Sequence, residues 1–164
     1  MDTKHILHDT WVLWTHLPYE QDWTKESYKE IMSFHTVEEA ICLLDAISPN
    51  LLINCMIFVM RQGITPLWED SKNINGGCFS YKVDNRSVPA VWKNLIYSLI
   101  GETLAIHAST QESITGVTVS PKKRFCIVKI WLSTCKYQTP SMIQDLFPNM
   151  TTQGSIFKRH VENE

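Results

Sequence analysis

The sequence predicts an α+β fold, with a curved antiparallel β-sheet and helices packed on its convex face. Segments rich in β-branched and aromatic residues follow one another in runs, and two separate segments carry apolar residues at helical spacing. Runs of strands with separate helices are typical of an α+β domain, whereas regular alternation would indicate a parallel sheet. The length of 164 residues suits one domain, which we expect to span residues 1–164.

The first part of the chain predicts a strand, a polar stretch and a helix. Residues 5–17 are rich in strand-favouring types, and this strand ends at Pro18. Residues 19–29 are polar. Thr36 then predicts a helix start, because its hydroxyl can cap the helix while Glu39 reaches back in a capping box.

In the middle of the chain, the sequence predicts the end of this helix, then a strand and a loop. The helix carries apolar residues at helical spacing, namely Ile41, Leu44 and Ile47, and residues 48–50 end it. Residues 51–60 form a β-rich apolar run that predicts a strand, closed by Gly63. Residues 64–70 predict a loop, because they contain a proline followed by polar residues.

The second half predicts a turn, a second helix and a hairpin. Residues 75–77, Asn-Gly-Gly, predict a turn before a short strand over 78–81. A helix begins near Ser87 and Pro89 and has one apolar face, formed by Trp92, Leu95, Ile96 and Leu99.

Two further strands and a less regular tail complete the chain. Residues 114–119 and 125–132 predict strands, joined by the basic loop 120–124. Residues 140–147 predict a short helix, and the last residues predict a loop.

Composition and charge narrow the class of protein. No apolar run approaches the roughly 20 residues of a membrane-spanning helix, and residues 1–5 lack the start of a secretory signal. We therefore expect a cytoplasmic protein without a membrane partner. The five scattered cysteines form no C-x-x-C pair, so we expect free thiols, no metal site and no cofactor. A net charge of −2 gives no global attraction for nucleic acid, so such binding needs a local constellation of residues.

Six tryptophans are many for this length, and some could be exposed platforms for a flat ligand. In the predicted loop, Trp68 stands beside Glu69. An exposed indole stacks best on a cation, and a neighbouring carboxylate accepts two parallel hydrogen bonds from a donor–donor edge. N7-methylguanine is cationic and carries such donors on N1 and N2. Taken alone, however, a packed tryptophan beside a solvated carboxylate is the commoner explanation of such a pair.

Further motifs surround this pair from residue 5 to about residue 132. They are His5-x-Leu7 with Trp11-x-Leu13-Trp14, Thr36-Val37-Glu38-Glu39, Gly63-Ile64-x-Pro66-x-Trp68-Glu69-Asp70, Asn73 with Gly76-Gly77, Leu99-Ile100-Gly101-Glu102, Gly116, and Lys129-Ile130-Trp131. In order and spacing they resemble the translation initiation factor 4E family, which binds the 7-methylguanosine cap of messenger RNA.

The resemblance implies a cap-binding slot on the concave side of the sheet. Trp23 and Trp68 would stack on the two faces of the base. Glu69 would accept from N1 and N2, the Trp68 backbone N–H would donate to O6, and Trp131 would pack on the N7-methyl group. The remaining tryptophans are interpreted as structural, namely Trp11, Trp14 and Trp92.

The resemblance also implies a site for the cap triphosphate in the basic loop. Lys122 and Arg124 would bind the phosphates, and Lys123 between them would point away. Without the tryptophans, a solvated hairpin tip would explain these charges. The acidic residue that steadies the family's phosphate arginine is matched by Met56, and a basic residue after the Gly-Gly turn is matched by Cys78. We therefore expect weaker phosphate binding than is usual in the family.

The convex side departs further from the family. Val37 is kept, but the tryptophan that docks the scaffold factor 4G is matched by Ile41. A leucine–glutamate pair on the second helix is matched by Lys93 and Asn94. Losing such anchors disrupts a binding hot spot, so we expect a non-standard scaffold partner. Residues 154–158 loosely match the family's last loop, which approaches the nucleotide after the cap.

Three functions remain open from sequence. The first is a translation factor that binds capped messenger RNA and a scaffold of factor 4G type. The second is a cap-binding repressor that does not engage factor 4G. The third is a protein-interaction module that kept the fold but lost cap binding, against which the retained tryptophans argue. No carboxylate cluster, and no nucleophile with a base, points to an enzyme.

Overall fold

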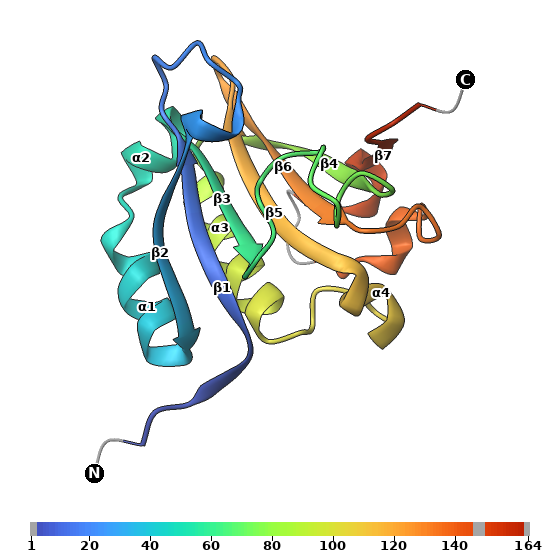
Figure 1. The fold of residues 1–164 in the computed structure, drawn as a ribbon, viewed down its shortest axis with the longest axis horizontal. Helices are drawn as coiled ribbons and strands as arrows, with labels where there is room; N and C mark the ends of the chain where they lie inside the picture. Colours follow the sequence, from blue (N-terminus) through green and yellow to red (C-terminus); the bar gives the residue numbers. More distant parts are fainter. Residues whose placement is uncertain (1–2, 146–149, 163–164) are drawn as a thin grey trace.

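The computed structural model describes residues 3–145 and 150–162 and confirms the α+β class (Figure 1). The strands are β1 (Ile6–His16), β2 (Tyr28–Thr36), β3 (Met56–Arg61), β4 (Gly77–Asp84), β5 (Ile114–Pro121), β6 (Phe125–Leu132) and β7 (Ile156–Arg159). The α-helices are α1 (Val37–Ala46), α2 (Pro49–Asn54), α3 (Val88–Ile100) and α4 (Ala108–Ser113), and the 3-10 turns are η1 (Lys25–Ser27), η2 (Pro140–Met142) and η3 (Thr152–Gly154). Within these residues, no helix is both long and apolar enough to cross a membrane.

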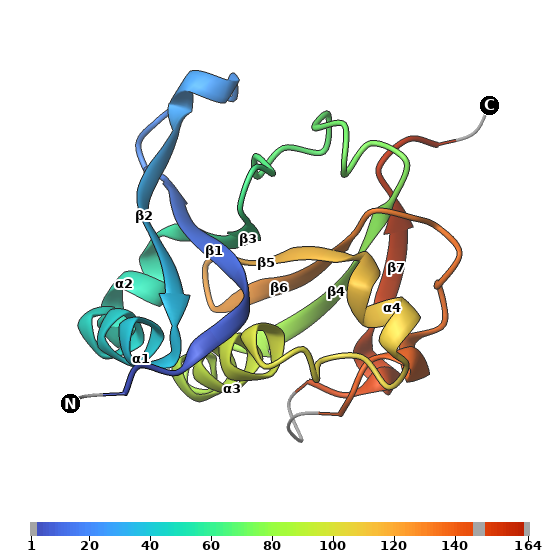
Figure 2. The same ribbon diagram turned by 60° about the horizontal axis from the view of Figure 1, so that its bottom comes forward.

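The described strands form one seven-stranded antiparallel sheet in the order β2-β1-β3-β5-β6-β4-β7. Helices α1, α2 and α3 lie on one face of this curved sheet (Figure 2). The loops that follow β1 and β3 extend from the opposite side of the sheet (Figure 2). The helices thus leave one face of the sheet uncovered beneath two long loops.

Helix α3 buries a continuous apolar stripe against the sheet. Its buried residues recur at spacings of three and four, as in an amphipathic helix, and they are Val88, Val91, Trp92, Leu95, Ile96, Leu99 and Ile100. They share the main core with Leu13, Val59 and Val117 of the sheet. Each large side chain buried in this way contributes about 1.5–3 kcal/mol relative to exposure. Trp11 and Trp92 are both buried here, which confirms their interpretation as structural residues.

Helix α1 begins at the predicted capping box. The Thr36 hydroxyl accepts from the Glu39 N–H at 3.2 Å, and the Glu39 carboxylate accepts from the Thr36 N–H at 3.2 Å. A cap of this kind contributes about 1 kcal/mol. The helix runs to Ala46, in agreement with the sequence analysis.

The strand predicted over residues 51–60 is wrong in its first half. Residues 49–54 form α2, because the Ser48 hydroxyl accepts from the Leu51 N–H at 3.2 Å and Pro49 occupies the first helical turn. Strand β3 begins only at Met56. A short apolar run has no period that separates a strand from a buried helical turn.

Strand β2 was not predicted from the sequence. This strand lies at the edge of the sheet and pairs only with β1, so most of its side chains are exposed. It therefore lacks the alternation of apolar and polar residues that marks a half-buried strand.

The C-terminal region also differs from its prediction. The helix expected over 140–147 is limited to η2 within the described residues, and residues 146–149 lie outside them. The final residues were expected to form a loop, but Ile156–Arg159 form β7, which pairs with β4. The short helix α4 was not predicted either. Elements of four and six residues without a buried apolar side chain carry too little pattern to recognise.

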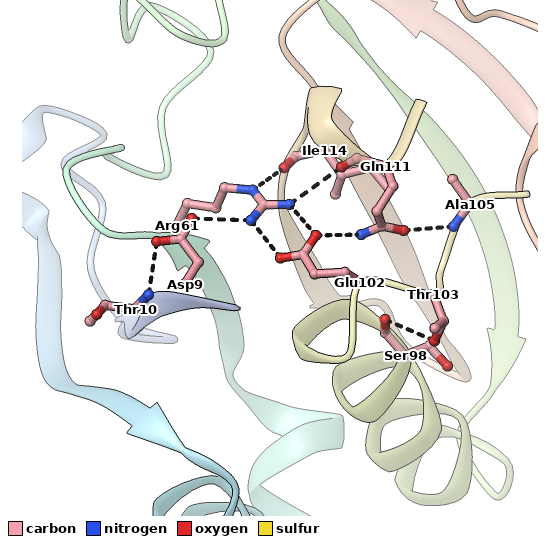
Figure 3. A network of polar contacts seen from close by, with 9 residues as sticks. All are labelled: Asp9, Thr10, Arg61, Ser98, Glu102, Thr103, Ala105, Gln111 and Ile114. Carbon is pink, nitrogen blue, oxygen red and sulfur yellow. Dashed lines mark hydrogen bonds and ion pairs between the residues drawn. The ribbon is translucent and has the colours of Figure 1, made fainter. Parts of the chain in front are cut away.

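Arg61 ties the sheet to the end of α3 (Figure 3). Its guanidinium donates to both carboxylate oxygens of Glu102, at 2.8 and 2.9 Å, and to Asp9 at 3.1 Å. Its Nε donates to the Ile114 carbonyl at 2.7 Å. Gln111 also donates to the Glu102 carboxylate, at 3.2 Å, while Glu102 itself adopts a left-handed conformation with φ of 57°. These bonds connect β1, β3, β5, α3 and α4 at one point.

Candidate functional site

The face of the sheet opposite the helices is formed by alternate residues of the strands. Side chains alternate between the two faces of a strand, so the sequence neighbours of core residues point away from the helices. One row across β1, β3, β5, β6 and β4 consists of Trp14, Phe58, Thr118, Lys129 and Ser80. The next row, across β3, β5, β6, β4 and β7, consists of Met60, Gly116, Trp131, Cys78 and Lys158. We call this surface the concave face.

Trp23 lies on the loop between β1 and β2 and is stacked on His16. The indole is 60% exposed, whereas His16 is only 3% exposed. Their rings are parallel within 2°, with centroids 4.0 Å apart. The His16 Nε2 lies 2.8 Å from the Asp22 carbonyl, and because a carbonyl only accepts, this nitrogen carries the proton. One face of the Trp23 indole is thus covered, and its exposed area lies on the other face and the edges.

Asn73 fixes the loop that carries Trp68 to the sheet. Its side chain is fully buried and donates to the carbonyls of Thr65 and Leu67, at 3.2 and 2.9 Å. Its oxygen accepts from the Thr115 hydroxyl of β5 at 2.8 Å. The loop is therefore held from inside, while Trp68 remains 45% exposed.

The two acidic residues after Trp68 have different environments. Asp70 accepts from the Thr65 hydroxyl at 2.6 Å and from its N–H at 2.9 Å. Burial alone would raise the pKa of Asp70, but the hydrogen bonds outweigh it and hold the pKa below its ordinary value. Glu69 is exposed. Burial, and then the charge of Glu69, raise the pKa of Tyr28, the first residue of β2 after the Trp23 loop.

Trp131 forms part of the floor of the concave face. It is 7% exposed, and its Nε1 donates to the Thr118 hydroxyl at 2.8 Å, which fixes the orientation of the indole. Trp131 and Trp68 line one hollow of about 230 Å³, which we call the β7 hollow. Its other walls come from β4, β6, β7 and the residue after β7, and they consist of Cys78, Ser80, Lys129, Lys158, Arg159 and His160.

Trp23 and Lys122 line a second hollow, of about 240 Å³, together with Met56. Lys122 and Met56 thus line the same hollow. Lys123 and Arg124 are exposed on the hairpin tip and line neither hollow. The β7 hollow thus groups Trp68 with Trp131, and the second hollow groups Trp23 with Lys122.

The positions considered for partner binding lie on the helical face. Val37 begins α1 and is half-buried, while Ile41 of the same helix is 42% exposed. Lys93 and Asn94 are exposed on α3. The Lys93 ammonium donates to Asp45 of α1 at 2.9 Å, so an ion pair joins the two helices at this surface.

Several residues of the site were not selected from the sequence, namely His16, Tyr28, Lys129 and His160. The first three acquire their places through strand register, whereas His160 directly follows β7 and its N–H donates to the Gly76 carbonyl at 3.0 Å. His16 and Tyr28 pair across β1 and β2, and Lys129 pairs with Ser80 across β6 and β4. Lys129 belongs to a recognised motif, but nothing in the motif indicated which face of the sheet its side chain occupies. In the described part of the chain, no three His, Cys, Asp or Glu side chains gather as a metal site.

The fold and the site together define a class of protein: a curved sheet with helices on one face and an aromatic, partly basic binding face on the other. Two exposed indoles suit a flat, electron-poor ring, and the lysines nearby suit a negatively charged group attached to that ring. Residues 6–160 match the family model of eukaryotic initiation factor 4E, so the chain belongs to this family.

Relatives and solved structures agree with this membership. The chain is 32% identical over 137 residues to eukaryotic translation initiation factor 4E-2 of Schizosaccharomyces pombe. The matched region covers 80% of this chain and 55% of that protein. It is 48% identical over 62 residues to the factor 4E homolog of Acanthamoeba polyphaga mimivirus, covering 38% of this chain and 23% of that protein. The chain thus spans about half the length of the fission yeast relative.

The fold resembles solved factor 4E structures. Schistosome eIF4E complexed with m7GpppG and 4E-BP aligns with a TM-score of 0.74 and 26% identity, over 82% of this chain and 75% of that one. The complex of C. elegans eIF4E-3 with the 4E-binding protein Mextli and a cap analog aligns with a TM-score of 0.72 and 25% identity, over 81% and 76%.

Proposed function

We propose that this chain binds the 7-methylguanosine cap of messenger RNA and acts in translation initiation in the cytoplasm, as one cap-binding domain without catalysis. The observation that carries the proposal is the exposure of Trp23 and Trp68. All six tryptophans lie within the described residues, and only these two are among the exposed large hydrophobic side chains. Exposed apolar area on this scale is unfavourable in water, at about 25 cal/mol per Å². A ligand that stacks on the two rings removes this cost.

The neighbours of the two indoles favour a methylated guanine. Glu69 carries a free carboxylate for the N1 and N2 donors, and methylation strengthens these donors because it withdraws electron density from the ring. Trp131, held by Thr118, offers an apolar surface for the N7-methyl group. Lys122, beside Trp23, and Arg124, on the exposed tip, would meet the triphosphate. The cap ligands of the schistosome and nematode relatives support this assignment.

The test is quenching of tryptophan fluorescence by 7-methyl-GTP, with GTP as the control nucleotide. We expect preferential binding of the methylated nucleotide. Trp23→Ala and Trp68→Ala should each weaken it by about 1–3 kcal/mol, because each removes one stack. Glu69→Gln should reduce the preference for 7-methyl-GTP over GTP, because an amide cannot accept two hydrogen bonds from the base edge.

Tyr19→Ala is the matched control, since Tyr19 is a 95% exposed aromatic residue in the same loop as Trp23. It should leave binding unchanged. Equal binding of the two nucleotides, or binding of neither, contradicts the proposal and favours a protein-interaction module that has lost the cap.

A second function, cap-binding repression, is favoured by the helical face. A scaffold partner, proposed here as one of factor 4G type, would meet Val37, but it would find Ile41 in place of an aromatic anchor. It would also find the Lys93 ammonium already engaged by Asp45. Buried anchors carry most of the binding energy of an interface, so a chain that holds the cap without this scaffold would block initiation.

A peptide with the factor 4G motif distinguishes these two functions. Under the repressor hypothesis the wild-type chain binds it weakly, and the triple variant Ile41→Trp, Lys93→Leu, Asn94→Glu gains affinity. Tight binding by the wild-type chain instead supports the translation factor. Cap binding should be the same in both proteins, because these positions lie on the other face of the sheet.

A further inference from the structure

Positive charges gather around the β7 hollow. Lys129 of β6 lines it from one side, and Lys158 and Arg159 of β7 line it from the other. The net charge of the chain is −2, so this positively charged cluster is opposite in sign to the molecule as a whole. The indoles of Trp68 and Trp131 line the same space.

The other titratable groups in the lining are uncharged at neutral pH. Burial, and then the charge of Lys129, lower the pKa of His160 to about 4. Burial raises the pKa of the Cys78 thiol to about 12, although the charge of Lys129 acts against it. Because Lys129 affects both groups, its ammonium lies close to the hollow. None of the described residues that line the hollow carries a carboxylate.

Strand register explains how β7 brings a cation to this point. Cys78 of β4 pairs with Trp131 on one side and with Lys158 on the other, so the three side chains share the concave face. Adjacent strands lie about 4.8 Å apart, so the Cα atoms of Lys158 and Trp131 are roughly 10 Å apart, which a lysine side chain can largely span. The uncharged Cys78 lies between them.

Within the part of the chain that the structure describes, the three cations form no ion pair. No carboxylate in residues 3–145 and 150–162 lies within 4.0 Å of Lys129, Lys158 or Arg159, and the ion pairs of this part of the chain are formed by other residues. Like charges beside a partly closed, aromatic-lined space repel one another with less screening than in bulk water. An anion bound among them relieves this repulsion.

We infer that the β7 hollow is a second anion-binding site, in which Lys129 and Lys158, with Arg159 at its edge, bind a phosphate group of the capped RNA. This inference rests on the proposed function. The site differs from the basic loop, because Lys122 lines the separate hollow beside Trp23. The phosphate comes either from the triphosphate bridge or from the first phosphodiester after the cap.

The test uses the double variant Lys129→Met, Lys158→Met, which removes the charges and keeps most of the side-chain volume. Binding is measured at 50–200 mM salt for three ligands: 7-methylguanosine, 7-methyl-GTP and a short capped RNA. Loss of the contact to one single-stranded phosphate reduces the slope of log affinity against log salt by about 0.7. The wild-type chain should therefore lose about 2.6-fold more affinity for its phosphate ligand across this range than the variant does.

The three ligands separate the two sources of the phosphate. If the double variant has a smaller salt slope already with 7-methyl-GTP, the site binds the triphosphate. If its salt slope is smaller only with capped RNA, the site binds the phosphodiester. Binding of 7-methylguanosine, which carries no phosphate, should be equal in both proteins. Lys4→Met, beside Glu38 on the helical side of the sheet, is the control for the charge change.

Two results overturn the inference. One is a salt slope of the double variant equal to that of Lys4→Met. The other is an equal loss of 7-methylguanosine binding, because the lysines would then act on the base or the fold. A wild-type chain that does not prefer 7-methyl-GTP over GTP contradicts the proposed function itself and removes this inference with it.

Discussion

The imidazole of His16 and the indole of Trp23 lie parallel, with 4.0 Å between their ring centroids and 2° between their planes. Tyr28 packs edge-on against His16 at 5.0 Å, and Phe58 packs against Tyr28 at 5.6 Å. A base on the free face of Trp23 would therefore be the third ring of a stack whose lower members are fixed by the sheet. A platform that is already rigid loses less conformational entropy on binding.

His16→Ala should weaken binding of 7-methyl-GTP by about 1 kcal/mol, because Trp23 loses its aromatic partner. His16→Phe keeps a ring behind the indole and loses only the hydrogen bond to Asp22, so it should retain most of the affinity. Fluorescence titration measures the 7-methyl-GTP affinity of both variants, and near-ultraviolet circular dichroism reports the packing of Trp23. Equal losses in the two variants would show that the hydrogen bond, rather than the stack, positions the loop.

Asn73 offers a second test, on the loop of Trp68. Asn73→Ala removes three side-chain hydrogen bonds; the Thr65 and Leu67 carbonyls each keep a backbone N–H donor, whereas the Thr115 hydroxyl loses its acceptor, so the protein should be destabilised by about 1–3 kcal/mol. It should also weaken cap-analogue binding, because Trp68 is then less well positioned. Urea unfolding and fluorescence titration measure the two effects.

Thr115→Val is the matched control for Asn73→Ala, since it removes one of the three hydrogen bonds and keeps the side-chain volume. Its effects should be smaller on both measurements. If Asn73→Ala weakens binding as strongly in a Trp68→Ala background as in the wild type, the loss does not act through Trp68.

Elements with a strong local signal were predictable from sequence. The start of α1 was predicted because Thr36 and Glu39 make a capping box that depends only on neighbouring residues. Helix α3 was predicted because its apolar stripe repeats at helical spacing. Strands β5 and β6 were predicted because both are long and largely buried.

Elements at the edges of the sheet were not predictable, because their stability comes from pairing rather than from their own pattern. Strand β2 exposes most of its residues, and β7 is four residues long. The same limit applies to the site. Trp23 and Trp68 could be selected by residue type and resemblance, but the pairing that brings Lys158 beside Cys78 exists only in the folded sheet.

The Arg61 network predicts a strong stability effect far from the binding face. The side chains of Arg61 and Glu102 are only 13% and 20% exposed, so Arg61→Met leaves a largely buried carboxylate without its partner. A loss of about 3–5 kcal/mol is expected from urea unfolding, because breaking one side of a buried pair is costly. Lys93→Met is the comparison, since the Lys93–Asp45 pair is exposed and should contribute less than about 1 kcal/mol.

A double-mutant cycle tests this explanation of Arg61. Replacing Glu102 with Gln in the Arg61→Met background removes the unpaired charge, so part of the lost stability should return. Strictly additive effects of the two substitutions would indicate that Arg61 acts through its stacking on Trp11, 4.5 Å from the ring, and not through the ion pair.

His160 gives the stability of the protein a pH dependence. Its pKa in the folded protein is about 4, below the ordinary value of 6.5, because burial and then the charge of Lys129 disfavour the imidazolium. Between pH 6.5 and about 4 the unfolded chain therefore binds more protons at this residue than the folded chain does. The contribution of His160 to the free energy of unfolding falls as the pH falls through this range, and it changes no further below about pH 4.

His160→Phe removes the titrating group and keeps an aromatic ring against Trp131, whose centroid lies 5.0 Å from that of His160. Its free energy of unfolding, measured in urea at pH 7, 6, 5 and 4, should therefore decline less than that of the wild type. His8→Phe is the control, because His8 is exposed on β1, and it should follow the wild-type decline. Other acidic groups titrate equally in all three proteins, so the difference between the curves isolates His160. Parallel curves for His160→Phe and the wild type would mean that His160 takes up its proton as readily in the folded chain as in the unfolded one.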